Sequence, residues 1–247
     1  MLITKEFRMT RDRAPDEVTL QRDYYKRTSS HYDEMHVNAQ GEHDFALAFM
    51  LSSIRFLDIH SLLDIGSGTG RALLTLKDTF PELRLSGIEP SPELREIGYC
   101  KGLSQNELTD GDAQALAYAD RSFDLVCEFG VLHHVPHPTK AVSEMLRVAS
   151  KAIFISDSNN FGQGGLIART VKQTLSSLRL WPLADFIKTR GKGYLISEGD
   201  GLAYSYSVFS NYEQISAACK SVHVLNTVPA GPNPYRTASH VALLGIK

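Results

Sequence analysis

The sequence has few cysteines and no long apolar run. Cys100, Cys127 and Cys219 are far apart and show no C-x-x-C spacing, which excludes a disulfide scaffold and is typical of a reduced intracellular protein. No window approaches the roughly 20 apolar residues that a membrane-spanning helix needs. The charged start MLITKEFRMTRDRAPDEV lacks the apolar core of a signal peptide. We therefore predict a cytoplasmic protein without a membrane partner.

A strong charge of either sign is also absent. The formal net charge is −2 and the isoelectric point is near 6.5. The chain as a whole is therefore not drawn electrostatically to nucleic acid or to an anionic membrane. Hydrophobic residues make up 43% and charged residues 22% of the 247 residues, a balance that allows a sizeable buried core.

Short apolar runs alternate with helical patterns over much of the chain. SLLDIG, LRLSGIEPS, SFDLVCEFGVLHHV and KAIFISDSN predict strands, and NELTDGDAQAL contains a shorter one. Between the strands, GRALLTLKDTFP, PELREIGYCKGL and PTKAVSEMLRVA predict helices. This alternation predicts a doubly wound α/β fold, with a mostly parallel sheet that helices cover on both faces.

Further segments flank this alternating region, and we predict one domain over residues 1–247. Residues 1–41 predict a polar arm and a cap, followed by a helix at about 42–58. Residues 160–210 begin with a helical pattern, become rich in glycine and aromatics, and predict a lid over one end of the sheet. Residues 211–247 predict a helix and then two strands, VHVLNTVP and HVALLGIK, paired antiparallel at a sheet edge.

Gly66, Gly68 and Gly70 follow the first predicted strand in LLDIGSGTGR. Glycine costs backbone entropy, so we expect these three to allow a tight turn and to bring a ligand close to bare amides. Ligands of open α/β sheets bind where a strand hands over to a helix. Arg71 and Ala72 exclude the Gly-Lys-Ser/Thr ending of a P-loop, and Arg71 stands where the dinucleotide fingerprint needs its third glycine.

Four motifs, in order, resemble those of the class I S-adenosylmethionine-dependent methyltransferases, of the type 11-like small-molecule group. They are LLDIGSGTG, GIEPS, GDAQAL and FDLVCEFGVLHHV, within residues 58–158. The resemblance implies a Rossmann-like, seven-stranded sheet, S-adenosylmethionine as the cofactor, and methyl transfer to a small-molecule acceptor. O-methylation is favoured, with N- or C-methylation as alternatives. The family's Lys-Pro-Gly-Gly turn before the fifth strand is missing from RVASKAIFIS.

The resemblance also implies how the cofactor is held. Glu89, at the end of the second strand, would accept both ribose hydroxyls. Asp112 and the Ala113 amide would bind the adenine. Asp64 and the glycine backbone would hold the methionine end, where an acid favours the ammonium group. The predicted cofactor-binding residues are Tyr32, Asp64, Gly66, Ser67, Gly68, Gly70, Glu89, Pro90, Asp112, Ala113, Glu128 and Phe129.

Aromatic residues are expected to close the site from two sides. In the family a tyrosine of the N-terminal cap covers the cofactor, and Tyr32 in SSHYDEMHV is its expected counterpart, ahead of Tyr25. Both tyrosines could instead only pack the cap helix down. The lid would supply the walls of a substrate pocket, with Tyr194, Tyr204, Tyr206 and Phe209 as candidates.

The end of the fourth strand carries the predicted catalytic residues, His133 and His134. An imidazole titrates near neutrality and can take a proton from a hydroxyl or amine; the alternative is that both histidines are structural. We predict no metal site. In HHVPH, Pro136 and Pro138 break any helix that would align the rings, and no cysteine is nearby. A magnesium site would need several carboxylates, and only Glu128 and Asp157 are candidates.

Two other classes of function remain open. One is a methyltransferase-like protein that binds the cofactor but acts as a scaffold or partner without catalysis. The other is a nicotinamide oxidoreductase, which Arg71 disfavours. A nucleic-acid substrate is not expected, because EFGV stands where methyltransferases of base amines carry an Asn/Asp-Pro-Pro-Tyr-like motif. Neither the acceptor molecule nor the oligomeric state can be predicted from these residues.

Overall fold

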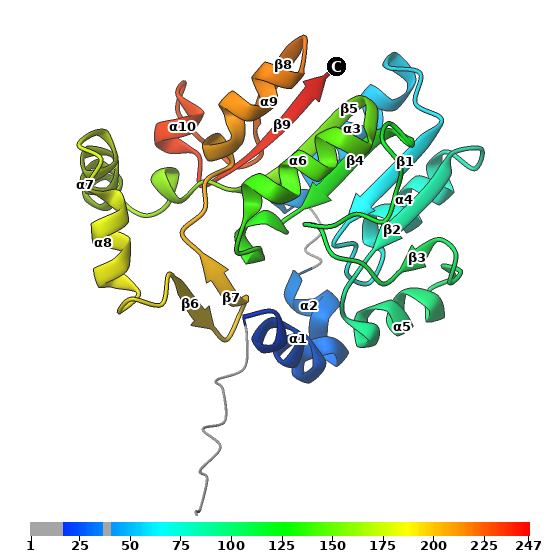
Figure 1. The fold of residues 1–247 in the computed structure, drawn as a ribbon, viewed down its shortest axis with the longest axis horizontal. Helices are drawn as coiled ribbons and strands as arrows, with labels where there is room; N and C mark the ends of the chain where they lie inside the picture. The colour runs from blue at the N-terminus through cyan, green and yellow to red at the C-terminus, as the bar shows by residue number, and fades with distance from the viewer. Residues whose placement is uncertain (1–16, 37–40) are drawn as a thin grey trace, which may run out of the picture.

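A computed structural model describes residues 17–36 and 41–247, so residues 1–16 and 37–40 of the predicted arm and cap lie outside the described part. Seven strands form one sheet in the order β3-β2-β1-β4-β5-β9-β8 (Figure 1). This confirms the predicted seven-stranded, doubly wound α/β fold. The strands are β1 (Ser61–Ile65), β2 (Arg84–Ile88), β3 (Leu108–Thr109), β4 (Phe123–Phe129), β5 (Ala149–Ser158), β8 (Ser221–Asn226) and β9 (His240–Ile246).

The strands β1 to β5 are parallel, and β9 alone of the seven runs in the opposite direction, since β8 is antiparallel to β9 and so points the same way as β5. β9 pairs antiparallel with β5 on one side and with β8 on the other, which confirms the predicted antiparallel pair at a sheet edge. Because β9 runs against its neighbour β5, its first residue, His240, lies opposite Ser158 at the end of β5. The start of β9 therefore belongs to the edge of the sheet where the parallel strands end.

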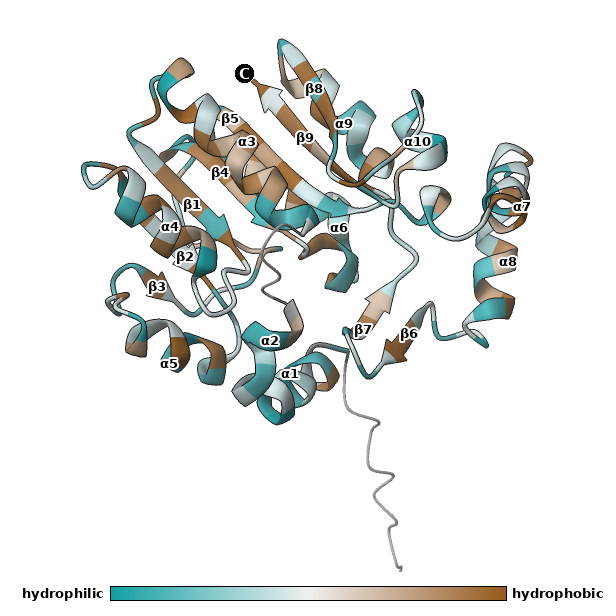
Figure 2. Ribbon diagram, turned by 180° about the vertical axis from the view of Figure 1, so that it is seen from behind, coloured by the Kyte–Doolittle hydropathy of each residue, from teal (hydrophilic) through white to brown (hydrophobic). Residues whose placement is uncertain are grey.

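Alternating side chains of the strands supply two apolar layers. On one face, Leu62 and Phe154 pack with residues of α3 (Glu42–Phe56) and α4 (Arg71–Thr79). On the other face, Leu63 packs with residues of α6 (Pro138–Val148) and α9 (Tyr212–Ala218). Figures 1 and 2 show these two helical layers from opposite sides. α5 (Pro92–Cys100) packs beside β3.

The cap helices and the lid lie across the carboxyl ends of the parallel strands (Figure 1). In the lid, α7 and α8 stand beside the sheet, and the hairpin β6–β7 reaches back to contact α1. The bounds are α1 (Glu17–Thr28), η1 (Ser29–His31), α2 (Tyr32–His36), η2 (Leu132–His134), η3 (Asn160–Gly162), α7 (Leu166–Ser177), α8 (Trp181–Lys188), β6 (Tyr194–Ser197), β7 (Gly201–Tyr204), η4 (Val208–Asn211) and α10 (Pro234–Thr237).

Two local features bear on the expectations from the sequence. α6 ends at Val148 and β5 begins at Ala149, so the turn that RVASKAIFIS lacks is absent from the structure as well. Within the described residues, no helix combines the length and the apolar character needed to cross a membrane.

Candidate functional site

Two adjoining cavities open where the parallel strands end. The larger has a volume of about 630 Å³ and the smaller of about 200 Å³. Tyr25, Tyr32, Gly66, Phe129 and His134 line both, so one ligand can extend from one cavity into the other. Both volumes together suit a small organic molecule and a second, separate reactant.

The glycine loop between β1 and α4 is left-handed at all three glycines, with φ of +66° at Gly66, +55° at Gly68 and +82° at Gly70. Side chains other than glycine rarely adopt this conformation. A Cβ at Gly66 would meet Val131, and one at Gly70 would meet Leu103. The glycines therefore serve the turn and the local packing, and only Gly66 of the three lines a cavity.

Glu89 ends β2 and is held by two backbone amides. One carboxylate oxygen accepts the Gly68 N–H at 3.0 Å, and the other accepts the Ser91 N–H at 2.8 Å. The residue is 4% exposed, and burial raises the pKa of its carboxyl to about 7. Each oxygen keeps a second lone pair, so this carboxylate in the wall of the smaller cavity can still accept ligand hydroxyls.

Asp64 lies on the floor of the larger cavity, within β1. It is 2% exposed, and burial raises the pKa of its carboxyl to about 6. The Cys127 thiol donates a long contact of 3.6 Å to it. Ser67 lines the same cavity, and its hydroxyl binds the Asp64 carbonyl oxygen. A buried acid with so few partners favours a cationic group in front of it.

The remaining predicted residues of the smaller cavity lie on two loops. Pro90, Asp112 and Ala113 line it. The Asp112 side chain is exposed and accepts the Gln114 N–H at 2.8 Å, which orders the loop after β3. The structure thus brings Asp112 and Glu89 to one cavity, although they are far apart in the sequence.

The cap positions Tyr25 and Tyr32 over the glycine loop. Their rings pack edge to face at 5.7 Å, and the Tyr32 hydroxyl lies 2.7 Å from the place that a Cβ at Gly68 would take. Asp33 connects the cap to the glycine loop and to the end of α5, because it accepts a hydrogen bond from Thr69 at 2.6 Å and pairs with Lys101 at 2.5 Å. Both tyrosines therefore form part of the cavity wall.

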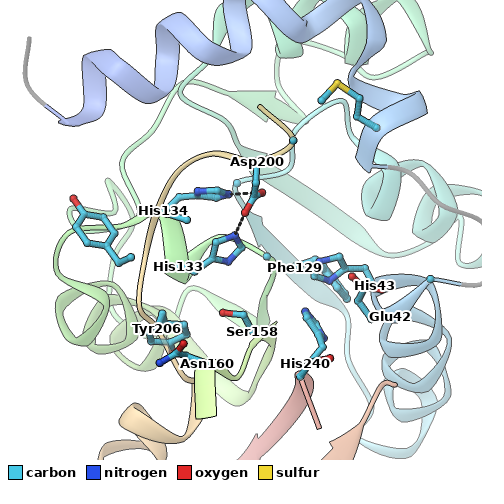
Figure 3. A pocket seen from close by; sticks show the side chains of 18 of the residues that line it. Glu42, His43, Phe129, His133, His134, Ser158, Asn160, Asp200, Tyr206 and His240 are labelled. Atoms are coloured by element: carbon cyan, nitrogen blue, oxygen red, sulfur yellow. Dashed lines mark ion pairs between the residues drawn. The ribbon is translucent and has the colours of Figure 1, made fainter. Parts of the chain in front are cut away.

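Carboxylates surround His133, one of the two predicted bases. Its Nδ1 lies 2.7 Å from Asp157. Its Nε2 lies 3.3 Å from Asp200, a contact drawn in Figure 3. Burial alone would lower the His133 pKa, but these two carboxylates raise it well above 6.5. An imidazole that keeps its proton cannot accept another. These surroundings argue against the predicted role of His133 as a general base.

His134 is similarly engaged. Its Nδ1 lies 2.6 Å from the Leu202 carbonyl oxygen, and its Nε2 lies 3.4 Å from Asp200. Leu202 and Asp200 both belong to the β6–β7 hairpin and its turn. Both ring nitrogens thus face oxygen atoms of the lid hairpin, which argues against the predicted role of His134 as a base.

Glu128 is not brought to either cavity, although it was predicted to bind the cofactor. It is fully buried, and its carboxylate accepts the Val131 N–H at 2.8 Å and the Ser156 N–H at 3.0 Å. Burial and the nearby Asp157 raise its pKa well above the ordinary range. Its contacts hold the turn after β4, and Phe129, the next residue, is the one that lines both cavities.

The far end of the larger cavity is polar and was not expected. His240, Asn160 and Tyr206 line it, with His43 alongside (Figure 3). The His43 and His240 rings meet at right angles, 4.6 Å apart. Burial lowers the pKa of His43 to about 3 and also lowers that of His240, so both rings are neutral at pH 7. Within the described residues, His240 Nε2 and Asn160 Nδ2 are buried without a hydrogen-bond partner.

The lid contributes two of its four candidate wall residues. Tyr204 and Tyr206 line the larger cavity. Tyr194 instead packs edge to face on Tyr204, and Phe209 packs on Tyr235. Tyr194 and Phe209 are therefore not wall residues, because each is turned toward an aromatic neighbour.

Asp200, His43 and His240 are site residues that sequence reasoning missed. A signal existed for His240, because the first residue of an antiparallel strand next to β5 must lie at the edge where the parallel strands end. His43 lies at the start of the helix that leads into β1, and this start also faces that edge. Nothing local marks Asp200, which stands alone in the turn between two lid strands.

Comparisons with known proteins point in one direction. Residues 63–154 match a family described as a methyltransferase domain. The chain is 29% identical over 129 residues to YcgJ of Bacillus subtilis, an uncharacterised methyltransferase, with 50% of this chain and 49% of that protein covered. It is 34% identical over 91 residues to demethylmenaquinone methyltransferase of Deinococcus radiodurans, with 35% and 37% covered. The chain thus spans about half, or less, of the length of these curated relatives.

A solved structure resembles the whole fold. The crystal structure of magnesium protoporphyrin IX methyltransferase from Synechocystis PCC 6803 with bound SAH superposes with a TM-score of 0.59. The match covers 94% of this chain and 100% of that one, at 16% sequence identity. At this identity the likeness shows a common fold.

Proposed function

Since this chain belongs to the class I S-adenosylmethionine-dependent methyltransferase family, with its methyltransferase domain at residues 63–154, we propose that it transfers a methyl group to a small-molecule acceptor. S-adenosylmethionine is its cofactor, and when bound it supplies an electrophilic methyl group on a sulfonium. The observation that carries the proposal is the pair of adjoining cavities, one walled by Glu89 and the other floored by Asp64.

The residues of this chain fit the cofactor at both ends. Glu89, 4% exposed and with lone pairs left over, suits the ribose hydroxyls. Asp112, Ala113 and Pro90 line the same small cavity and suit the adenine. Asp64 and Ser67 lie in the larger cavity, where the buried carboxyl suits the ammonium group of the amino-acid end.

The acceptor occupies the polar end of the larger cavity in this proposal. His240 is the candidate proton acceptor in place of His133 and His134, because its ring is neutral and its Nε2 is unpartnered among the described residues. The hydroxyl of Thr227 lies 2.7 Å from Nδ1 and can fix the tautomer. Asn160 can donate from Nδ2 to an acceptor oxygen. A hydroxyl acceptor, which needs both a proton acceptor and a donor, therefore fits best.

We also propose residues 160–210 as the lid that excludes water from this reaction. The hairpin β6–β7 lies between α1 and η2, since Gln21 accepts the Leu202 N–H at 2.6 Å and His134 contacts the Leu202 carbonyl. Tyr204 binds Glu17 of α1 through its hydroxyl at 2.6 Å. Cap and lid thus meet over the cavities. Water exclusion strengthens the electrostatic interactions that orient two reactants.

Cofactor binding is tested by calorimetric titration of S-adenosylmethionine into the wild type, Glu89→Ala and, as a matched control, Glu82→Ala. Glu82 is exposed and outside both cavities. We expect Glu89→Ala to weaken binding about tenfold or more, a loss of about 1.4 kcal/mol, and Glu82→Ala to leave it unchanged. The dissociation constant of the wild type should fall as the pH rises through about 7, where Glu89 ionises, and that of Glu89→Ala should not.

Methyl transfer is tested with radiolabelled cofactor and a panel of phenols, carboxylic acids and amines. We expect transfer to a hydroxyl compound, and His240→Ala should lower kcat while cofactor binding stays as in the wild type. Binding without transfer to any acceptor would favour the alternative, a cofactor-binding scaffold. No binding of S-adenosylmethionine would overturn the proposal.

A further inference from the structure

Three side chains from two distant segments converge beside the larger cavity. His133 and His134 come from η2, after β4, and Asp200 comes from the turn of the lid hairpin (Figure 3). Their Nε2 and carboxylate atoms lie within 4.8 Å of one another. All three residues line the cavity, so what they bind is in contact with the space for the acceptor.

The Nδ1 atom of each ring already has an oxygen partner. His133 Nδ1 lies 2.7 Å from the carboxylate of Asp157, and Asp157 is fully buried and itself accepts the Leu132 N–H at 2.8 Å. His134 Nδ1 lies 2.6 Å from the Leu202 carbonyl. When Nδ1 donates its hydrogen, the lone pair is on Nε2. Metal-binding histidines almost always give their other ring N–H to a carboxylate or a carbonyl in this way.

The distances between the two Nε2 atoms and the Asp200 carboxylate suit metal coordination better than direct hydrogen bonding. Nε2 of His133 and of His134 lie 3.3 Å and 3.4 Å from the oxygens of Asp200. Charge-assisted N–H···O bonds are shorter, at about 2.7–2.9 Å. Metal–ligand distances of about 2.0–2.1 Å in a tetrahedral site separate neighbouring ligand atoms by about 3.3–3.4 Å. The space between the three groups is therefore of the size that one ion needs.

The local charge also favours a cation. Asp157 and Asp200 flank His133 on both sides, at 2.7 Å from Nδ1 and 3.3 Å from Nε2. Without an ion, two neighbouring rings with centroids 3.9 Å apart share one carboxylate at Nε2. One divalent ion in place of the two Nε2 hydrogens would bind all three groups at once.

We propose that His133, His134 and Asp200 bind a single divalent transition-metal ion of the zinc type, with the remaining coordination position open to the larger cavity. Imidazole nitrogens select such ions over magnesium or calcium. Three protein ligands and one open position are the arrangement of zinc sites that bind water or a substrate oxygen. The HHVPH segment and its neighbours predict no metal site, and Asp200 lies far along the chain from the histidines.

The ion would also join the lid to the segment after β4, since Asp200 belongs to the hairpin and the histidines to η2. The open position takes an oxygen or nitrogen donor, which defines the acceptor class as one with a hydroxyl, carboxylate or amine. This deduction about the acceptor rests on the proposed function, whereas metal binding itself does not.

The test is metal binding by the full chain, without cofactor or acceptor. After chelator treatment and dialysis, Zn²⁺ affinity is measured by competition with a chromophoric chelator, and the visible spectrum of the Co²⁺ form reports the ligand geometry. The ligand variants are His134→Gln and Asp200→Asn. The matched controls are His60→Gln and Asp78→Asn, since both residues are exposed and lie outside the site.

We expect one ion per wild-type chain, with affinity about a hundredfold weaker in His134→Gln and about tenfold weaker in Asp200→Asn. The controls should bind as the wild type does. The Co²⁺ form should show the intense visible bands of a four- or five-coordinate ion, and Asp200→Asn should change them. No saturable binding, or equal affinities in ligand variants and controls, would overturn the metal site. The three residues would then only form ion pairs between η2 and the lid hairpin. S-adenosylmethionine titration of the same samples separates this failure from failure of the proposed function.

Discussion

The sheet region, residues 42–158, and the lid helices α7 and α8 use similar amphipathic sequences with different results. In the sheet region, α3, α4 and α6 each bury an apolar face against the strands. In α7 and α8 no residue is buried. Figure 2 shows hydrophobic residues on both lid helices. The most exposed apolar side chains of the lid helices are Leu166, Ile167, Phe186 and Ile187.

Since no residue of α7 or α8 is buried, polar contacts hold much of the outer part of the lid. Gln173 donates to the Phe161 carbonyl at 2.9 Å, and Tyr24 donates to the Glu198 carbonyl at 3.0 Å. Such bonds contribute about 1 kcal/mol each, whereas a buried aromatic contributes several. The two regions should therefore differ in stability, with Asp200, the proposed metal ligand, on the loosely held side.

The largest expected difference is between two phenylalanines. Phe154 of β5 is fully buried, and Phe186 of α8 is 61% exposed. Phe154→Ala should lower the free energy of unfolding by about 3–5 kcal/mol, because it leaves a cavity in the core. Phe186→Ala should change it by less than about 0.5 kcal/mol. Urea unfolding of the two variants checks this, and equal losses would contradict the division into a packed and a loosely held region.

A second pair of residues separates backbone strain from packing. Gly70 and Gly193 have nearly the same φ, +82° and +79°. A Cβ at Gly70 would collide with Leu103, whereas one at Gly193 has no atom within 4 Å. Alanine at either position should cost about 1–2 kcal/mol for the left-handed backbone, and at Gly70 about 1–3 kcal/mol more for overpacking. Thermal unfolding measures both variants. A larger loss at Gly193 would show that the lid is packed more tightly than its contacts indicate.

The smallest expected effect on stability is local and concerns a hydrogen bond between α1 of the cap and β7 of the lid. Gln21 accepts the Leu202 N–H at 2.6 Å. Gln21→Ala removes this bond and should destabilise the β6–β7 hairpin by about 1 kcal/mol. Hydrogen exchange at residues 194–204 should then become faster, while exchange in β1 and β4 stays the same. Gln105→Ala, an exposed change far from the lid, is the control. Faster exchange throughout the sheet would mean that lid and core unfold as one unit.

The order of strands and helices in the sheet region could be predicted because each element carries its own pattern. The run SLLDIG forms β1 and GRALLTLKDTFP contains α4, which ends at Thr79, just before Pro81. The antiparallel pair β8–β9 was also predicted from two β-rich runs joined by a turn. Patterns of period 2 and 3.6 act over a few residues, so the sequence displays them directly.

The structure places some of the predicted site residues at the cavities and others away from them. Glu89 and Asp112 were expected at strand ends and do line one cavity. Glu128 was expected there too. Successive side chains of a strand point to opposite faces, so Glu128 is buried and its neighbour Phe129 lines the cavities. His133 was predicted as a base from its ordinary pKa, which the charges of Asp157 and Asp200 change.

The sequence by itself determined the sheet, the helices that cover it and the family motifs at the strand ends, since these depend on local patterns. Only the tertiary structure decided which distant side chains meet. It brought Asp200 to the two histidines, turned Tyr204 toward the cavity and Tyr194 away from it, and left the Nε2 atom of His240 without a hydrogen-bond partner among the described residues. The reason is physical, because burial, charge and distance act between residues that are close in space, whatever their separation along the chain.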